Sequence, residues 1–217
     1  MQKMISSPYK PHSVSACSKA VSLSCCLAPK HVEHVANSQP LVWFPMRVTY
    51  NRELKVKEQL DMLGIENFVP MKYDWIEQQV VLVPAVHNLI FVHSTQEKLT
   101  SLKMSRKEFT PLRYMTKPSA DGRGHVIMHV PERQMSNFMR VASVMDSSVT
   151  YLKCNDFISK VGRKVRITDG LFKDVEGVIK RIKKNKYVVV QIDGVAAVAI
   201  TYVPACWLAE LADNSQE

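Results

Sequence analysis

The sequence predicts an α+β fold in which an antiparallel sheet with helices is followed by a small all-β unit of SH3-like size. In the first half, segments rich in β-branched and aromatic residues alternate with segments whose apolar residues recur at helical spacing. The second half has only short strand-like segments, separated by turns such as Asp169-Gly170 and Asp193-Gly194. We therefore expect a first domain over residues 41–146, a linker over residues 147–158 and a second domain over residues 159–211.

The first domain is predicted to begin with a strand over residues 41–49 and a helix after it. Asn51 can cap this helix, because its side-chain oxygen can accept bonds from free backbone N–H groups. Val56, Leu60 and Leu63 fall at i, i+4 and i+7, which gives one buried stripe. Gly64 should end the helix, since a left-handed cap suits glycine.

The rest of the first domain is predicted as strand, strand, helix, strand, strand and helix. Residues 65–75 and 80–93 form the first two strands, and Pro84 predicts an edge, bulge or loop near residues 84–88 because it lacks a ladder donor. Ser94 and Glu97 make a capping box for the next helix. Short strands over residues 112–116 and 126–130 flank a loop, and Pro131 suits the first position of the last helix. The buried face of that helix should comprise Met135, Phe138, Met139 and Ala142.

The second domain should contain strands over residues 161–167, 175–182, 187–192 and 195–203. Four or five short strands in so few residues predict a small barrel.

Composition narrows the class of partner. The chain of 217 residues carries a formal net charge of +9, which favours a polyanionic partner such as nucleic acid. Its five cysteines are an odd number without a CxxC pair, so we expect a reducing, cytoplasmic location and no disulfide scaffold. No apolar run is long enough for a membrane span.

Residues 1–40 are interpreted as a disordered tail or as the product of an upstream start codon. Within them, Cys26, His31 and His34 are only three candidate ligands in a flexible segment, which makes a poor metal site. We therefore expect no metal and no cofactor.

A basic strand, an Asp-Gly turn, an aromatic residue and a further glycine follow one another in the second domain, and this pattern resembles a KOW motif. The positions that carry the resemblance are Gly162, Val165, Ile167, Gly170, Phe172 and Gly177. Ribosomal proteins share this motif, so a KOW-type RNA- or ribosome-binding protein is the alternative reading.

Segments of the first domain resemble the N-terminal domain of NusG, and that domain followed by one KOW barrel is the architecture of the NusG and RfaH family. The segments are Trp43-Phe44-Pro45-Met46-Arg47, Phe68-Val69-Pro70, and Val83-Pro84 leading into Leu89-Ile90-Phe91-Val92. Residues 82–93, 52–55 and 114–116 are more similar to the UpxY group of Bacteroidales, which act on capsular polysaccharide operons. One departure is that Ala85 and Val86 follow Pro84, where NusG proteins usually carry a glycine and then an aromatic residue.

The resemblance implies a cytoplasmic, monomeric transcription antitermination factor without catalytic activity. Such a factor binds the clamp region of RNA polymerase. It contacts the non-template DNA strand or nascent leader RNA, and its KOW domain binds Rho or a ribosomal protein. The expected polymerase-binding residues are Trp43, Phe44, Val83, Pro84, Leu89 and Phe91. The expected nucleic-acid-binding residues are Arg47, Asn51, Arg52, Lys55, His87, Asn88, Lys183, Lys184 and Lys186. The alternative for the apolar set is a place in the core, and for the polar set a solvated surface or turn. A cysteine hydrolase is disfavoured, because neither Cys154 nor Cys206 has a context that would lower its pKa.

Overall fold

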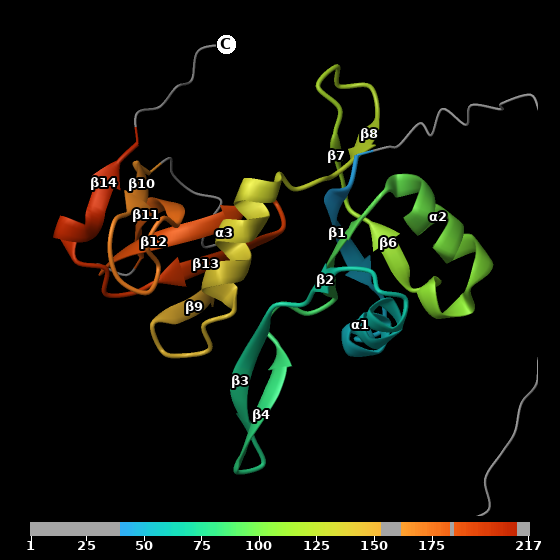
Figure 1. Ribbon diagram of the computed structural model, residues 1–217, viewed down its shortest axis with the longest axis horizontal. Helices are drawn as coiled ribbons and strands as arrows, with labels where there is room; N and C mark the ends of the chain where they lie inside the picture. Colours follow the sequence, from blue (N-terminus) through green and yellow to red (C-terminus); the bar gives the residue numbers. More distant parts are fainter. Residues whose placement is uncertain (1–39, 153–161, 183–184, 212–217) are drawn as a thin grey trace, which may run out of the picture. The chain divides into compact units, whose positions relative to one another are not determined.

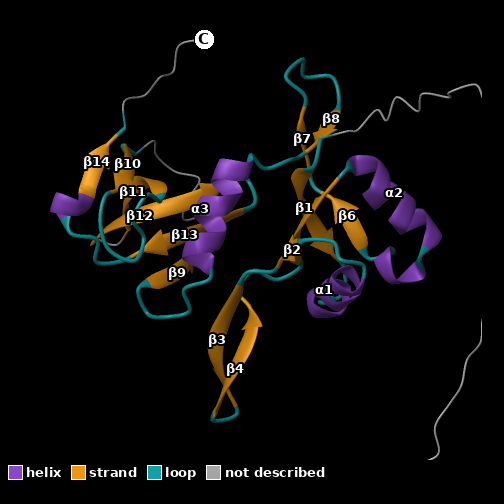
Figure 2. Cartoon of the chain, viewed as in Figure 1, coloured by secondary structure: helices purple, strands orange, loops and turns teal. Residues whose placement is uncertain are grey.

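The structure is a computed structural model, and it describes residues 40–152, 162–182 and 185–211 (Figure 1). The described residues from Pro40 onward belong to one unit of mixed α/β structure with antiparallel sheets, so the predicted α+β class is confirmed (Figure 2). The predicted tail, with Cys26, His31 and His34, lies outside the described residues except for Pro40.

The helical elements are α1 (Glu53–Met62), α2 (Gln96–Ser105), η1 (Lys107–Phe109), α3 (Glu132–Ala142) and η2 (Ala205–Trp207). The strands are β1 (Val42–Val48), β2 (Asn67–Phe68), β3 (Met71–Ile76), β4 (Gln79–Pro84), β5 (Leu89–Ser94), β6 (Leu112–Tyr114), β7 (Thr116–Pro118), β8 (His125–Ile127), β9 (Val149–Leu152), β10 (Lys164–Ile167), β11 (Glu176–Ile182), β12 (Asn185–Ile192), β13 (Ala196–Ile200) and β14 (Leu208–Glu210).

The first sheet has four strands in the order β2-β5-β1-β6. Alternate residues of its central strand β1 enter two different cores, as the two-residue period of a strand requires. Phe44, Met46 and Val48 belong to the core that α1 and α2 complete. Trp43 belongs instead to the core that contains Phe138 of α3. Helices therefore cover both faces of β1.

Prolines divide two of the predicted strands. The segment predicted over residues 65–75 separates into β2 and β3 at Pro70, which has no N–H to donate to a ladder. The segment predicted over residues 80–93 separates into β4 and β5, with the loop at residues 85–88 that Pro84 indicated. Among the described residues, β3 and β4 pair only with each other, and so do β7 and β8.

The predicted cap of α1 is wrong. Arg52 is the N-cap residue and its side chain makes no capping hydrogen bond, whereas Asn51 has φ = 49° and belongs to the turn before it. The predicted stripe is confirmed at Val56 and Leu60, which are buried. Gly64 follows the helix with φ = 64°, as predicted.

The predicted capping box of α2 is also wrong. Ser94 is the last residue of β5, and Thr95 caps the helix by accepting a hydrogen bond from the Lys98 backbone N–H at 3.3 Å. Strand pairing therefore takes Ser94 away from the cap that its spacing to Glu97 had suggested. Pro131 is the N-cap of α3 rather than its first residue.

The second sheet has six strands in the order β14-β10-β11-β12-β13-β9. Strands β10 to β13 follow the predicted segments. Strand β9 is a correction, because it occupies part of the predicted linker and pairs with β13. Strand β14 was not predicted. Within the described ranges no pairing joins β14 to β9, so the sheet is not a closed barrel.

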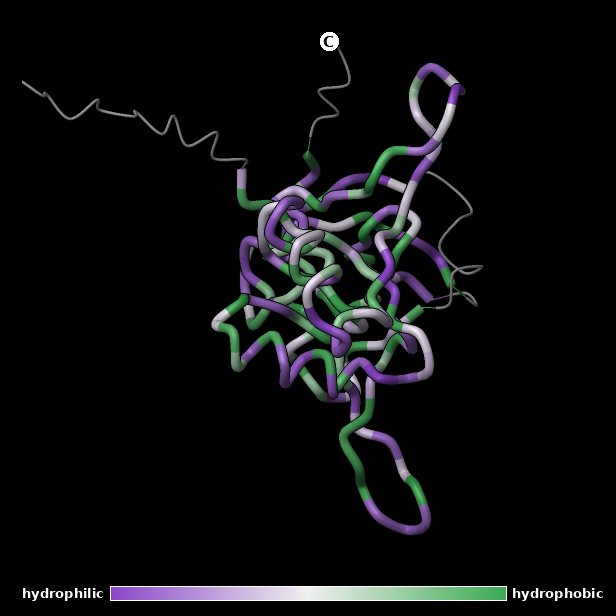
Figure 3. Tube along the Cα trace, turned by 90° about the vertical axis from the view of Figure 1, so that its right-hand side faces the viewer, coloured by the Kyte–Doolittle hydropathy of each residue, from purple (hydrophilic) through white to green (hydrophobic). Residues whose placement is uncertain are grey.

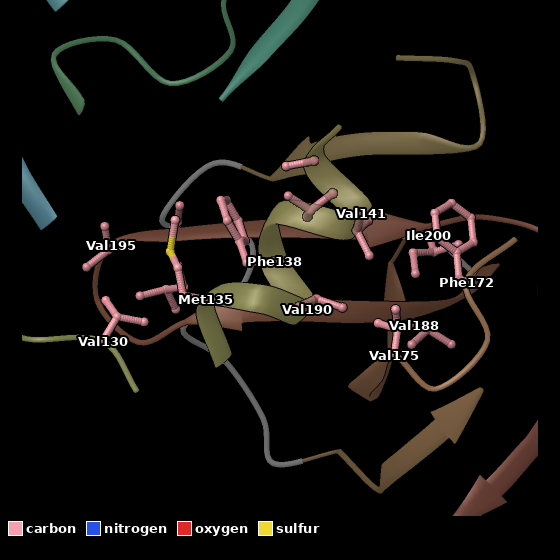
Figure 4. Packing of buried hydrophobic residues seen from close by; sticks show 14 of the residues in the cluster. Val130, Met135, Phe138, Val141, Phe172, Val175, Val188, Val190, Val195 and Ile200 are labelled. Carbon is pink, nitrogen blue, oxygen red and sulfur yellow. The ribbon is translucent and has the colours of Figure 1, made fainter. Parts of the chain in front are cut away.

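Helix α3 contributes to one apolar core with strands β12 and β13 of the second sheet (Figure 4). Its residues Met135, Phe138, Val141 and Ala142 are buried, which confirms the predicted face except that Met139 is only half-buried. The Phe138 ring also lies 5.7 Å from the Phe91 ring of β5. Helix α3 is thus the element through which the first sheet and the second share a core.

Candidate nucleic-acid interface

Two loops that are distant in the sequence meet at the end of β1. The Asn88 carbonyl oxygen accepts a hydrogen bond from the Val48 N–H at 3.0 Å, and the Asn88 side-chain oxygen accepts one from the Asn51 N–H at 3.3 Å. These bonds hold residues 49–52 against the loop of residues 85–88. We call residues 49–52 and 87–88 the loop pair. It holds Asn51 and Asn88 in direct contact, with Arg52 and His87 next to them along the chain, and all four are among the residues predicted to bind nucleic acid.

The backbone of the loop pair is held in left-handed conformations. Tyr50 has φ = 66°, Asn51 has φ = 49° and Asn88 has φ = 61°. Asparagine tolerates this region, but for a bulky residue such as tyrosine it is an outlier that the surroundings must enforce. Such conformations cluster at functional sites, where the strain is part of the design.

A buried carboxylate enforces this geometry from below. Glu53, the first residue of α1, is 2% exposed, and its Oε1 accepts a hydrogen bond from the Asn88 backbone N–H. A carboxylate is also favourable at a helix N-terminus because of the free N–H groups there. Glu53 therefore positions the loop pair, and sequence reasoning missed it, because an acidic residue in a first helical turn looks like an ordinary surface group.

Tyr50 is the second residue that sequence reasoning missed. Its side chain is 82% exposed, and the Arg52 guanidinium carbon lies 5.7 Å from the centre of its ring. An exposed aromatic ring beside a cation is the combination on which single-stranded bases stack. The signal in the sequence was an aromatic residue between the strand and a basic helix, but periodicity cannot say that it faces solvent.

Several cationic side chains lie close to the loop pair in the sequence or in the fold. Arg47 lies directly opposite Arg113 in the pairing of β1 with β6, and both side chains are exposed. Like charges in such a pair are unfavourable unless an anion is present. An open cleft of about 320 Å³ is lined by Arg52 of the loop pair, by Lys55 and Lys107, and by two glutamates. The local charge therefore suits a phosphate backbone, although the two glutamates reduce the potential of the cleft.

The predicted polymerase-binding residues lie mostly in the interior. Trp43, Phe44, Leu89 and Phe91 are each at most 4% exposed, whereas Val83 and Pro84 at the end of β4 are half-buried. Central strands with helices on both faces leave no room for these side chains at the surface. Trp43 keeps one polar contact, since its Nε1–H donates to Glu132 Oε2 at 2.9 Å.

The residues of the KOW pattern have structural roles in the second sheet. Val165, Ile167 and Phe172 are buried. Gly170 has φ = 82°, and a Cβ atom on Gly177 would lie 2.8 Å from Cγ1 of Val188. The basic run after this motif is described only in part: Lys186 is exposed, whereas Lys183 and Lys184 lie outside the described residues.

No cluster of three or more metal-ligating side chains occurs in the part of the chain that the structure describes. The same residues include no helix that is long and apolar enough to cross a membrane. Cys206, which the sequence placed in a possible hydrolase, is a free and exposed thiol.

Residues 41–139 match the protein family described as "Transcription termination factor nusG". The chain is also similar to a solved structure described as "Domain interaction in Thermotoga maritima NusG", with 17% identity and a TM-score of 0.40, over 80% of this chain and 98% of that chain. None of the curated proteins compared with this chain matches it.

Proposed function

We propose that this chain, which carries a NusG-type domain over residues 41–139, is a transcription elongation and antitermination factor that binds RNA polymerase. The observation that carries the proposal is the loop pair, which lies within that domain and presents Tyr50 and Arg52 on a rigid base. The factor acts by binding and has no catalytic step.

The loop pair is suited to a single DNA strand near the transcription bubble. Tyr50 offers a ring face to a base, and Arg52 offers a cation to the neighbouring phosphate. His87, which precedes Asn88 in the chain, is exposed and can hydrogen-bond a base edge. Because the Glu53 contact fixes the loop before binding, little conformational entropy is lost when the strand docks. The non-template strand is the single strand that the polymerase leaves open to such a surface.

A protein that holds both the polymerase and this strand would favour the closed, elongating state over paused states, because it binds the elongating state more tightly than the paused states. We propose that the outcome is read-through of long operons. The narrower assignment to capsular polysaccharide operons rests on the resemblance of residues 52–55, 82–93 and 114–116 to the UpxY group. Nascent leader RNA, Rho or a ribosomal protein remain the proposed partners of the second sheet.

The test is a run-off transcription assay with the full chain, a Bacteroides-type RNA polymerase and a long capsule-operon template. The wild-type chain should increase full-length RNA. The Y50A/R52A double variant should lose most of that increase while it still binds polymerase. Tyr202→Ala is the matched control, because Tyr202 is 93% exposed and lies outside the loop pair.

The salt dependence of binding to single-stranded DNA separates the two side chains. Arg52→Ala should remove about one phosphate contact, so the slope of log affinity against log salt concentration should become less steep by about one. Tyr50→Ala should weaken binding with little change in that slope. A wild-type chain that does not bind polymerase, but is retained on ribosomes, would refute the proposed function and favour a KOW-type ribosome-binding protein.

A further inference from the structure

The β3–β4 hairpin carries a largely exposed apolar face, part of which borders an open cleft toward residues 144–152. Tyr73 is paired with Leu82 and Trp75 with Val80, and directly opposed residues of an antiparallel pair project to the same side. Their exposed fractions are 57% for Tyr73, 74% for Trp75, 53% for Val80 and 41% for Leu82. We call these four residues the hairpin ladder. A contiguous exposed patch of this kind marks an interaction site more often than a scatter of single residues does.

The hairpin is built to hold this ladder in place. Its two strands are joined by Glu77 and Gln78, with φ = 49° and 66°, which is the two-residue turn that matches strand twist. At its base, the Ala85 N–H donates to the Pro70 carbonyl at 2.8 Å. The pairing is continuous from Met71 to Ile76, and Figure 3 shows the segment extending from the rest of the fold with apolar residues along it. An isolated hairpin is only marginally stable in water, so an exposed aromatic ladder on one has a cost that a partner would offset.

Charge on the hairpin indicates a protein rather than nucleic acid as the partner. The ladder itself contains no charged residue. On the opposite face, Lys72 Nζ is 2.8 Å from Asp74 Oδ2, and the hydrogen bond from Lys72 holds the pKa of Asp74 below its usual value. Glu77 adds a negative charge at the tip. With one cation, already paired, and two carboxylates, the hairpin would repel a phosphate backbone.

The size of the ladder indicates a partner that is also held elsewhere. Its two aromatic side chains offer roughly 200–330 Å² when their areas are scaled by their exposed fractions. A stable interface needs about 800 Å² on each partner, so a second copy docked through this face alone would not remain bound. On the ladder face, β4 continues from Val80 and Leu82 to Pro84, a half-buried member of the proposed polymerase-binding set, so the ladder adjoins that set at Pro84.

We propose that the hairpin ladder is a second polymerase contact, in which Trp75 and Tyr73 dock on an uncharged apolar surface of RNA polymerase. This inference rests on the proposed function and extends the polymerase footprint along β4 onto β3. Aromatic side chains at the centre of such contacts carry most of the binding free energy.

The first experiment is photo-cross-linking with the full chain in a reconstituted elongation complex, with p-benzoylphenylalanine in place of Trp75. A cross-link to a polymerase subunit is expected. Cross-links confined to DNA, to a second copy of the chain or to no partner would overturn the inference. The same probe at Tyr202 is the control for non-specific capture.

The second experiment compares the polymerase affinity of Y73S/W75S with that of the wild type. The double variant should bind about tenfold or more weakly, with Tyr202→Ser unchanged. If the wild type binds and the double variant binds equally well, the ladder is not a contact and the proposed function stands. If the wild type itself fails to bind, both proposals fail together. Melting curves guard against misfolding, and the cross-link, which keeps an aromatic group at position 75, gives an answer even if the double variant melts early.

Discussion

Replacement of Glu53 tests whether a buried carboxylate holds the loop pair in its left-handed conformation. In Glu53→Ala the half-buried Asn88 N–H loses its charged acceptor, at a position where the Glu53 side chain is 2% exposed. A hydrogen bond to a charged group contributes about 1.5–3 kcal/mol. The position in the first turn of α1 adds about 0.3–1 kcal/mol. We therefore expect the free energy of unfolding to fall by about 2–4 kcal/mol in Glu53→Ala, and by about half as much in Glu53→Gln, which retains an acceptor.

Urea unfolding followed by tryptophan fluorescence measures this change, with Glu58→Gln as the control. Glu58 is exposed on the same helix, so its replacement should change stability by less than about 0.5 kcal/mol. Glu53→Ala should also weaken binding to single-stranded DNA, although the buried Glu53 side chain cannot contact the DNA directly. A stability change below about 0.5 kcal/mol, or a stabilised Glu53→Gln, would refute the reasoning, because it would mean that desolvation of the carboxylate outweighs its hydrogen bond.

Three further predictions concern the cores and the buried tyrosine. Phe138→Ala should lower the free energy of unfolding by about 3–5 kcal/mol in the same urea assay, because the ring is fully buried against Phe68 and Phe91; a loss below about 1 kcal/mol would contradict this packing. Gly177→Ala should cost about 1–3 kcal/mol, since its Cβ would lie 2.9 Å from the Val189 carbonyl oxygen, whereas Gly122→Ala, with open space around it, should cost less despite its positive φ. Burial raises the pKa of Tyr151 to about 12, so stability should be unaffected below about pH 10 and should fall between about pH 10 and pH 12, where the unfolded chain loses the proton that the folded chain keeps. Urea titrations across that range should show this fall, and Tyr151→Phe should flatten it.

The elements of the first domain followed from the sequence because local signals agreed with tertiary packing. Val56 and Leu60 lie on the single apolar stripe of their helix, and both pack into the same core. Pro84 marks the end of β4, so the loop before β5 could also be predicted. The failures occur where two local signals competed. The spacing of Ser94 to Glu97 suggested a helix cap, but Ser94 also follows a run of strand-forming residues. It pairs with Val42 and is therefore the last residue of β5 instead of the cap of α2. Strand β9 has β-prone residues between turn formers, and only the pairing with β13 makes it a strand.

Among the residues predicted to bind nucleic acid, several are exposed, whereas most of the predicted apolar set lies in the core. Arg52 and Asn88 lie at element ends, where polar side chains have few alternatives to solvent or to one another. The contribution of Tyr50 could not be predicted, because its exposure depends on a left-handed turn that Asn88 fixes from another part of the chain.

Trp43 and Trp75 show why periodicity cannot identify a docking surface. Both stand in strands rich in aromatic and β-branched residues, and the two-residue period treats them alike. Trp43 lies in β1, which has a strand on each side and helices on both faces, and it is 1% exposed. Trp75 lies in a two-stranded hairpin without a covering layer, and it is 74% exposed. The number of neighbouring strands and layers decides which aromatic residue is core and which is available to a partner. For that reason, substitutions at Trp43 would report on folding, whereas substitutions at Trp75 can report on binding.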